Sequence, residues 1–347
     1  MDNSNNMQLT RIFSSLVFVM ALGFGMALPA QTNLAEIGCA SNALNGGQAH
    51  ALAIASHYAY VANGSDGLRI FDIANPASPV SLGQATNGGC TYCVAVTNNY
   101  AYVANLDDGL RVYDVSNPTN ILSVGHTNNG GLAIWVTLSG HYAYLANDTD
   151  GLRIYDVTTP SHPVNVGYAS NTNLIDASAY CVAVSSHYAY VANGRDGLRI
   201  YDVTDPTHPS NVGYAGNTNN GGYAEGVAVS GNTVYLANGH DGFRIYDVST
   251  PAHPVNTGYT PINNSAADIM SVTLSGNYAY LADYTSGLHV YNIASPTNLI
   301  CAANAYYSGY QQARAYPEYI AVAGNYAYVA NHLDGVRIYA LGILAGP

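Results

Sequence analysis

The chain contains no lysine and few charges of either sign. Only 9% of its 347 residues are charged, against about 25% in an average soluble protein. Its nine basic residues, all arginines, face 21 carboxylates, which gives a net charge of −12. Because nucleic-acid affinity depends on neutralising phosphates with Lys and Arg, this balance excludes a nucleic-acid partner. Disorder is excluded as well, since 48% hydrophobic residues can bury enough surface to offset the ordering entropy.

Helical periodicity is also missing after the first thirty residues, and tryptophan occurs only once. Tyrosine (31) and glycine (35) are abundant instead. Tyrosine favours strands and glycine favours turns. The composition therefore predicts an all-β protein.

No segment after residue 30 is long and apolar enough to span a bilayer. Before it, Arg11 precedes an apolar run over residues 12–28, which ends in Met26-Ala27-Leu28-Pro29-Ala30. This order is typical of a secretory signal peptide, so we expect residues 1–30 to be removed and the mature chain to be secreted or held at the cell surface. An uncleaved anchor is the alternative, because the run is close to the ~17-residue minimum for a span.

Five cysteines follow the predicted signal peptide: Cys39, Cys90, Cys93, Cys181 and Cys301. In an exported protein an odd number leaves at least one thiol unpaired. Cys90-Thr91-Tyr92-Cys93 has the spacing of a redox or metal motif, but no second such pair and no βαβ context accompany it. We expect either a local disulfide or two buried thiols here.

An internal repeat dominates residues 31–347. Its turn glycines are Gly67, Gly109, Gly151, Gly197, Gly242, Gly287 and Gly335, at spacings of 42, 42, 46, 45, 45 and 48 residues. This period is typical of propeller blades with four strands each. In the fourth unit we expect strands over 182–184, 188–193, 197–203 and 211–215, with a hairpin turn at Asp196-Gly197.

The seventh unit ends after its third strand, and the missing strand is found at the other end of the mature chain. Residues 36–41 align with residues 163–170 of the third unit, Ile37-Gly38 on Val166-Gly167. Pairing of this segment with the last strand would remove two open sheet edges. The sequence therefore predicts one domain over 31–347, a seven-bladed β-propeller of four-stranded blades that is closed by its N-terminal strand.

The third-strand signature is Leu-Arg-Ile-Tyr-Asp-Val followed by two prolines, as in residues 152–163. It resembles the LVIVD-repeat family of bacterial surface or secreted proteins, and the resemblance covers residues 33–340. The resemblance implies a β-propeller, and it supplies no shared catalytic residues to carry over. This chain departs from the pattern, because Arg or His replaces the second aliphatic residue and Tyr or Phe often replaces the fourth.

Two polar patterns recur in almost every unit. Arginine in the third strand (Arg69, Arg111, Arg153, Arg199, Arg244 and Arg337) is followed three residues later by aspartate in most units. We expect these groups to satisfy each other and the backbone between blades. The Asn-x-x-Asp-Gly turns suggest calcium, but no Glu follows at the twelfth position, so Asx-type turn closure is favoured.

All length variation falls between the two prolines and the next inner strand. The distance from the first proline to that strand is 20, 20, 24, 23, 23 and 26 residues, while the other spacings are constant. In a four-stranded blade these connections share one face with the second-to-third turns. Insertions on one face mark a binding side.

The residues just before each inner strand form an asymmetric ring at the channel mouth. Together with the longest loop they supply the candidate ligand-binding residues His50, Tyr92, Trp135, Tyr180, Glu225, Tyr307, Tyr310, Gln312, Arg314, Glu318 and Tyr319. Tyrosine, tryptophan and amide side chains suit the recognition of sugars or peptides. The alternative is that these residues form an ordinary polar surface in contact with solvent and bind no ligand.

No catalytic, metal-binding or phosphate-binding motif is present, so we expect no cofactor and no metal. The favoured hypothesis is an exported non-enzymatic propeller that binds a glycan or an extracellular protein, or associates with its own copies. The rival is a secreted carbohydrate-active enzyme, a hydrolase or lyase, that uses Glu225 and Glu318. Glycosidase carboxylates lie ~5–9.5 Å apart, a separation that sequence position alone does not determine.

Overall fold

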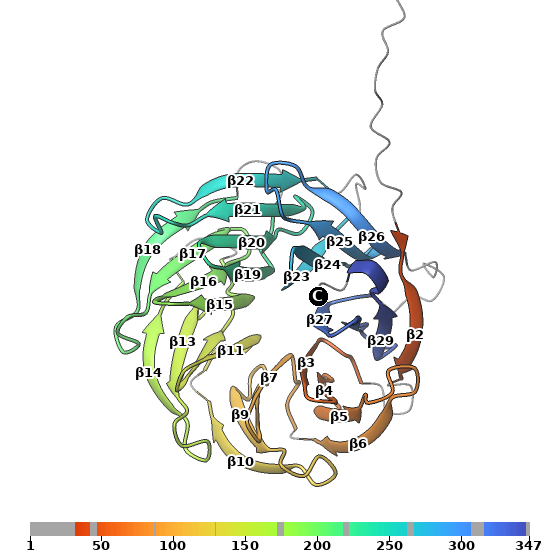
Figure 1. Ribbon diagram of the computed structural model, residues 1–347. Coiled ribbons are helices and arrows are strands. Elements are labelled where there is room, and N and C mark those ends of the chain that lie inside the picture. Colours follow the sequence, from red (N-terminus) through yellow and green to blue (C-terminus); the bar gives the residue numbers. More distant parts are fainter. Residues whose placement is uncertain are drawn as a thin grey trace, which may run out of the picture. The chain divides into compact units, whose positions relative to one another are not determined.

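A computed structural model describes residues 32–41, 47–86, 88–128, 130–171, 177–217, 222–261, 267–306 and 316–344. The predicted signal peptide lies outside these ranges. The described residues form seven small antiparallel sheets arranged in a ring (Figure 1). The expected all-β, seven-bladed β-propeller is therefore confirmed.

In blades one to six the four strands of the repeat run from the inner strand to the outer one in chain order. Blade one has β3 (Ala51–Ala55), β4 (Tyr58–Ala62), β5 (Leu68–Asp72) and β6 (Val80–Ala85). Blade two has β7 (Cys93–Thr97), β8 (Tyr100–Ala104), β9 (Leu110–Asp114) and β10 (Leu122–Thr127). Blade three has β11 (Trp135–Ser139), β12 (Tyr142–Ala146), β13 (Leu152–Asp156) and β14 (Val164–Ala169). Blade four has β15 (Cys181–Ser185), β16 (Tyr188–Ala192), β17 (Leu198–Asp202) and β18 (Ser210–Ala215), close to the four predicted strands.

The remaining blades follow the same order. Blade five has β19 (Gly226–Ser230), β20 (Thr233–Ala237), β21 (Phe243–Asp247) and β22 (Val255–Thr260). Blade six has β23 (Ile269–Ser275), β24 (Tyr278–Asp283), β25 (Gly287–Asn292) and β26 (Ile300–Tyr306). Blade seven has β27 (Tyr319–Ala323), β28 (Tyr326–Ala330) and β29 (Val336–Ala340), followed by a short 3-10 helix, η1 (Gly342–Leu344).

The core lies between neighbouring blades. In the second strand of each blade the last four residues are buried, for example Ala189 to Ala192 in β16. Both faces of these strands are covered by adjacent blades, so the alternation of apolar and polar residues is lost. Each inner strand contacts the next one around the ring, including β27 with β3. No helix in the described residues is long and apolar enough to cross a membrane.

The N-terminal strand closes the ring as the sequence predicted. Strand β2 (Ala35–Ala40) pairs antiparallel with β29, from Ala35 opposite Ala340 to Ala40 opposite Val336. Gly38 occupies the place that Gly167 has in blade three. A Cβ on Gly38 would lie 2.1 Å from the Pro76 carbonyl oxygen of the next blade, and one on Gly167 would lie 1.9 Å from that of Pro206. Only glycine permits this close approach between blades.

Two details differ from the sequence-based expectation. A short strand β1 (Thr32–Asn33) pairs in parallel with β26, so blade six has five strands rather than four. The neighbouring Leu34 is buried and packs with the cluster of blades six and seven. The extra strand arises because the chain crosses the edge of blade six on its way to blade seven.

The second correction concerns the repeated arginines. They pair within their own blade with the aspartate of the Asn-x-x-Asp-Gly turn, as Arg153 does with Asp150 at 2.6 Å, and not with the later aspartate. The turn asparagine donates to the same carboxylate, Asn147 Nδ2 to Asp150 Oδ2 at 2.7 Å. The later aspartate instead accepts from a backbone amide two residues on, as in Asp156 with Thr158. The pattern is thus structural, but it joins a turn to a strand rather than one blade to another.

All five cysteines lie in the described residues as free thiols. Cys93 and Cys181 are buried, whereas Cys90 and Cys301 are half-buried and Cys39 is exposed. Burial raises the pKa of Cys181 to about 12 and that of Cys93 further still. Cys90 and Cys93 therefore form no local disulfide, and only Cys93 of the pair is fully buried.

Candidate functional site

The ring predicted at the channel mouth is present and has a simple backbone cause. In six blades the ring residue directly precedes the inner strand, and its amide donates to the alanine carbonyl that ends the second strand of the same blade, as His50 does to Ala62. The other residues that make this bond are Tyr92, Ile134, Tyr180, Glu225 and Glu318. In six of the seven blades an isolated bridge, such as Gly64 with Thr91, joins the second-to-third turn to the start of the next blade. Turns and inter-blade loops therefore share one face, as predicted.

His50 and Glu318 from neighbouring blades form an ion pair at this mouth. His50 Nδ1 lies 2.6 Å from Glu318 Oε2, and their side chains are only 6% and 14% exposed. Burial alone would lower the pKa of His50, but hydrogen bonding to Cys90 and Glu318 outweighs it and raises that pKa to about 9. His50 is therefore cationic at neutral pH, which compensates the buried carboxylate.

Five aromatic rings from four blades form a continuous series at the same mouth. The Tyr92 ring stacks on His50 at 4.1 Å between centroids, and His50 meets His332 edge-on at 5.8 Å. Tyr316 stacks on His332 at 4.3 Å and contacts Tyr284 at 4.0 Å. We call this series, Tyr284, Tyr316, His332, His50 and Tyr92, the aromatic arc. Tyr284 is 42% exposed, and Tyr316 and Tyr92 are half-buried.

A second cluster of polar groups surrounds Glu225. This residue lines a cavity of about 500 Å³ together with Arg195, Tyr223, His240 and Asp268. It also lines a second cavity of about 330 Å³ that reaches Glu318. Tyr180 adjoins the cluster, with its hydroxyl 2.7 Å from that of Tyr223.

The pKa of the Glu225 carboxyl group is strongly raised. Burial, the negative charge of Asp268 and that of Glu318 raise its pKa to about 8. Two of the three glutamates in the chain therefore meet at this mouth, and one of them keeps its proton at neutral pH. A neutral carboxyl group of this kind can donate a hydrogen bond or a proton.

Trp135 and Tyr319 lie one residue deeper, at the start of their inner strands. Their rings touch at 4.9 Å between centroids in an edge-to-face arrangement, although they come from blades three and seven. Both side chains line the 330 Å³ cavity and also a cavity of about 510 Å³ on the side of blades one to three. The pair therefore spans the channel below the charged mouth.

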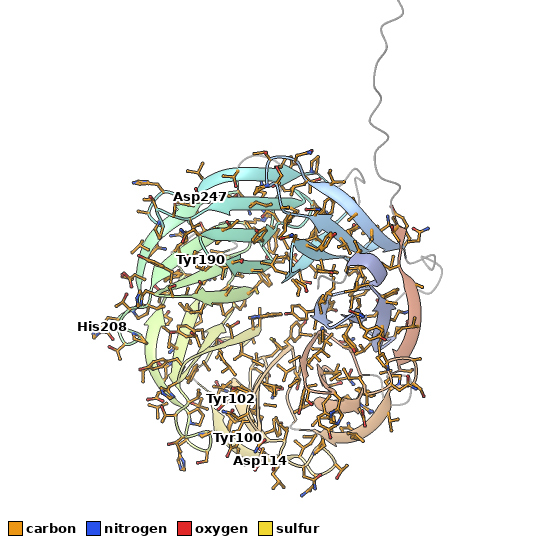
Figure 2. All side chains as sticks on the ribbon, in the orientation of Figure 1. Tyr100, Tyr102, Asp114, Tyr190, His208 and Asp247 are labelled. Carbon is orange, nitrogen blue, oxygen red and sulfur yellow. The ribbon has the colours of Figure 1, made fainter. Side chains whose placement is uncertain are left out.

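The structure brings together only part of the predicted set. His50, Tyr92 and Glu318 form one contact group, Tyr180 and Glu225 belong to a second, and Trp135 and Tyr319 span the channel. The loop residues Tyr307, Tyr310, Gln312 and Arg314 lie outside the described residues. Histidines such as His208, which Figure 2 shows at the outer rim, take no part in the mouth.

Sequence reasoning missed several residues of this face. Cys90, Tyr223, Asp268 and Tyr316 all stand two residues before the ring residue of their blade. His332 and Tyr284 follow the turn asparagine or its substitute. Aligning these two further positions across the seven units would have found them, since both vary from blade to blade. Within the described ranges, no group of three His, Cys, Asp or Glu could hold a metal ion.

The raised pKa of Glu225 makes a testable prediction about stability. Its folded pKa of about 8 lies above the ordinary value of 4.5, so the stability lost by burying this carboxyl is zero below pH 4.5 and grows as the pH rises to 8. Glu225→Gln removes this penalty. The full shift sets an upper bound of about 5 kcal/mol, and solvent at the mouth reduces the expected gain at pH 8 to about 2 kcal/mol.

Urea unfolding of wild type and Glu225→Gln at pH 4.5 and pH 8 measures this effect. Glu36→Gln is the matched control, because Glu36 is 36% exposed and pairs with Arg337 at the propeller edge. The control should give no stabilisation at either pH. An equal effect of Glu225→Gln at both values would contradict the assignment of a buried, protonated carboxyl.

The chain was compared with protein families, curated sequences and solved structures. A family model described as the LVIVD repeat matches residues 46–86, 88–128, 130–169, 177–215, 221–259, 266–305 and 316–338. No curated protein sequence matches the chain. Among solved structures, the computationally designed Ika8 protein is similar with a TM-score of 0.60 and 8% sequence identity, over 88% of this chain and 99% of that chain. At this identity the likeness concerns the fold alone.

Proposed function

This chain belongs to the LVIVD-repeat family, and from that premise we propose that it is an exported, non-enzymatic β-propeller that binds a glycan or protein ligand at the face carrying the variable inter-blade loops. Of the two ligand classes, the side chains at this face favour a glycan. The aromatic arc carries the proposal, because its five rings lie in contact around one side of the mouth.

The chemistry of the arc suits a sugar. Tyrosine rings offer a flat apolar face for the C–H groups of a pyranose and a hydroxyl for its oxygens. Glu318 stands beside the rings as a hydrogen-bonding group. Glu225 lines a cavity with Glu318 and a second cavity with Tyr223, which adds further hydrogen-bonding groups at the mouth. A mixture of aromatic faces and a few convergent polar groups is typical of small-ligand sites.

A glycan array with residues 31–347 tests the proposal, followed by titration of the best ligand. We expect Tyr316→Ala to weaken binding about 30-fold, which corresponds to the ~2 kcal/mol of a central aromatic anchor. Tyr168→Ala is the control, because Tyr168 is as accessible as Tyr284 of the arc (44% and 42% exposed) but stacks under Arg153 on the outer strand of blade three. Unchanged affinity in Tyr316→Ala and Tyr284→Ala would remove the arc from the binding site.

A separate experiment tests the residues of the longest inter-blade loop. Replacing Tyr307, Tyr310, Gln312 and Arg314 together by Ser should leave the melting temperature nearly unchanged, since surface changes typically cost at most ~0.5 kcal/mol. Weaker ligand capture by this variant would add the loop to the site. A large fall in melting temperature would instead make these side chains packing residues.

A second candidate function is a carbohydrate-active enzyme. The observation that favours it is the pKa of about 8 at Glu225, with Glu318 close enough to contribute to that shift. A general acid requires a pKa near the working pH. Turnover assays on a polysaccharide panel distinguish the two functions. Activity that disappears in both Glu225→Gln and Glu318→Gln would replace the binding-only proposal.

A further inference from the structure

Two polar side chains on the wall of the 330 Å³ cavity below the mouth lack partners within the part of the chain that the structure describes. Ser271 is only 5% exposed, and its hydroxyl is buried without a hydrogen bond. The Glu225 carboxyl makes no hydrogen bond and no ion pair there, whereas Glu318 is paired with His50 at 2.6 Å. A buried polar group without a partner is costly, so it requires an explanation.

The packing of two inner strands brings both groups to one cavity. Glu225 directly precedes β19 of blade five, and Ser271 lies in β23 of blade six. A Cβ on Gly226 would lie 2.8 Å from the Cα of Ser271. The glycine after Glu225 therefore permits the close approach of the next blade at this point.

The same cavity combines negative charge with aromatic surface. Glu225 and Glu318 are the only charged side chains that line it among the described residues, and Trp135 and Tyr319 contribute their rings. A cleft lined by charge of one sign concentrates ions of the opposite sign. Aromatic faces attract organic cations as well. Because His50 already compensates Glu318, the carboxyl group that remains for a cation is Glu225.

We propose that this cavity binds the ammonium group of a small organic amine, with Glu225 as the counter-ion and Ser271 as a hydrogen-bond acceptor. The rings of Trp135 and Tyr319 contact the carbon atoms next to the nitrogen. The cavity volume of about 330 Å³ lies within the range of about 300–1,000 Å³ that is typical of small-molecule pockets. No residue of the aromatic arc lines this cavity, so the inference is independent of the proposed glycan binding.

Binding of the ammonium ion is coupled to the loss of a proton from Glu225. The pKa of this carboxyl is about 8 in the free protein, and a cation beside it lowers that pKa. At pH 7 the complex therefore forms with the release of about one proton. Below pH 8 the affinity rises with pH, and above pH 8 it levels off because the carboxylate is already formed.

The other titratable groups around Glu225 are known from the two cavities that it lines. Those that share the 330 Å³ cavity are Glu318, Tyr319 and Cys181, and those that share the 500 Å³ cavity are Arg195, Tyr223, His240 and Asp268. Burial raises the pKa of Tyr319 and that of Cys181, so both stay neutral. His50, with a pKa of about 9, keeps Glu318 compensated. Glu225→Gln retains all of these groups, so it isolates the contribution of the carboxyl.

Fluorescence of Trp135 provides a direct test, because this is the only tryptophan in the chain and it lines the cavity. The probe is n-propylamine, which stays cationic at pH 8.5 since amines of this kind titrate near about 10.4. 1-Propanol is the uncharged probe of the same size. We expect a dissociation constant on the order of 1 mM for n-propylamine at pH 8.5, and about 30-fold weaker binding of 1-propanol, which forms no charge-assisted hydrogen bond.

Three variants assign the binding groups. Glu225→Gln should weaken n-propylamine binding about 30-fold at pH 8.5. It should also abolish the rise in affinity between pH 6 and pH 8.5, which we expect to be at least about tenfold in wild type. Ser271→Ala should weaken binding about fivefold through the loss of one hydrogen bond. Thr273→Val is the matched control, because the Thr273 hydroxyl lines the same cavity but already donates to the Ile320 carbonyl at 2.5 Å, and it should leave the affinity unchanged.

Two sources of the ammonium group are distinguished with D-glucosamine, and D-glucose is its uncharged counterpart. Tighter binding of D-glucosamine than of n-propylamine would identify an amino sugar, and the reverse order would identify a free alkylamine; either result supports the proposal. Tyr316→Ala, which tests the glycan site, should leave n-propylamine binding intact. Equal affinities for n-propylamine and 1-propanol, or an unaltered affinity in Glu225→Gln, would overturn the proposal. So would the absence of both a Trp135 response and a calorimetric heat of binding with n-propylamine.

Discussion

Removing residues 31–42 is expected to lower the melting temperature by at least about 10 °C and to cause aggregation. The deletion takes away β2, whose residues pair with β29 along its whole length. It also removes buried Leu34 and Ala40 and the 2.7 Å ion pair from Glu36 to Arg337. Losing several net hydrogen bonds at about 1 kcal/mol each, with the associated burial, corresponds to more than about 5 kcal/mol. The exposed edge of β29 then becomes a template for other chains.

A matched control moves the same segment instead of deleting it. Attaching residues 32–42 after Pro347 through a short flexible linker keeps the composition and restores a strand next to β29. Melting curves and size-exclusion chromatography of the mature, truncated and relocated chains measure the effect. Equal melting of the truncated and mature chains would contradict closure by the N-terminal strand.

Asp196→Ala is expected to cost about 3–5 kcal/mol, because it removes the carboxylate that pairs with a largely buried arginine. The Asp196 side chain is 0% exposed and that of Arg199 only 14% exposed. Asn193 Nδ2 also donates to Asp196, at 2.8 Å. Urea unfolding measures the loss, and the arginine–aspartate pairs of five other blades stay intact in this variant.

Asp202→Ala is the matched control in the same blade. Asp202 accepts one backbone hydrogen bond, from Thr204 at 2.8 Å, at an exposed turn. We expect a loss of about 1 kcal/mol or less. Equal losses of stability in Asp196→Ala and Asp202→Ala would mean that both aspartates stabilise Arg199 equally. That result would contradict the observed pairing.

The difference between these two aspartates illustrates what the repeat pattern leaves open. In sequence, Asp196 and Asp202 both lie three residues from Arg199, one before it and one after it. In the strand, Arg199 and Asp202 point to opposite sides because side chains alternate. The turn folds Asp196 back toward the arginine, with Gly197 at φ 96°. Spacing alone therefore suggested the wrong partner.

In the candidate site, too, the sequence identified residues but not the contacts between them. His50, Tyr92 and Glu318 were found because they occupy one repeat position and differ in type. Their contacts were not predictable, because they join blade seven to blades one and two, at the opposite end of the chain. The sequence singled out Cys90 only for its spacing to Cys93, and it left out His332, which looks like an ordinary loop residue until the ring closes.

The sequence by itself determined the fold, the number of blades, the closing strand and the face on which variation gathers. A period of about 45 residues with constant internal spacings permits one local structure, and seven copies of it bury their surfaces only by stacking on one another. Only the tertiary structure decided which side chains meet at the channel mouth, because the meeting residues come from different blades. Their distances and the pKa values that follow from them depend on how the ring closes, and no local pattern encodes that.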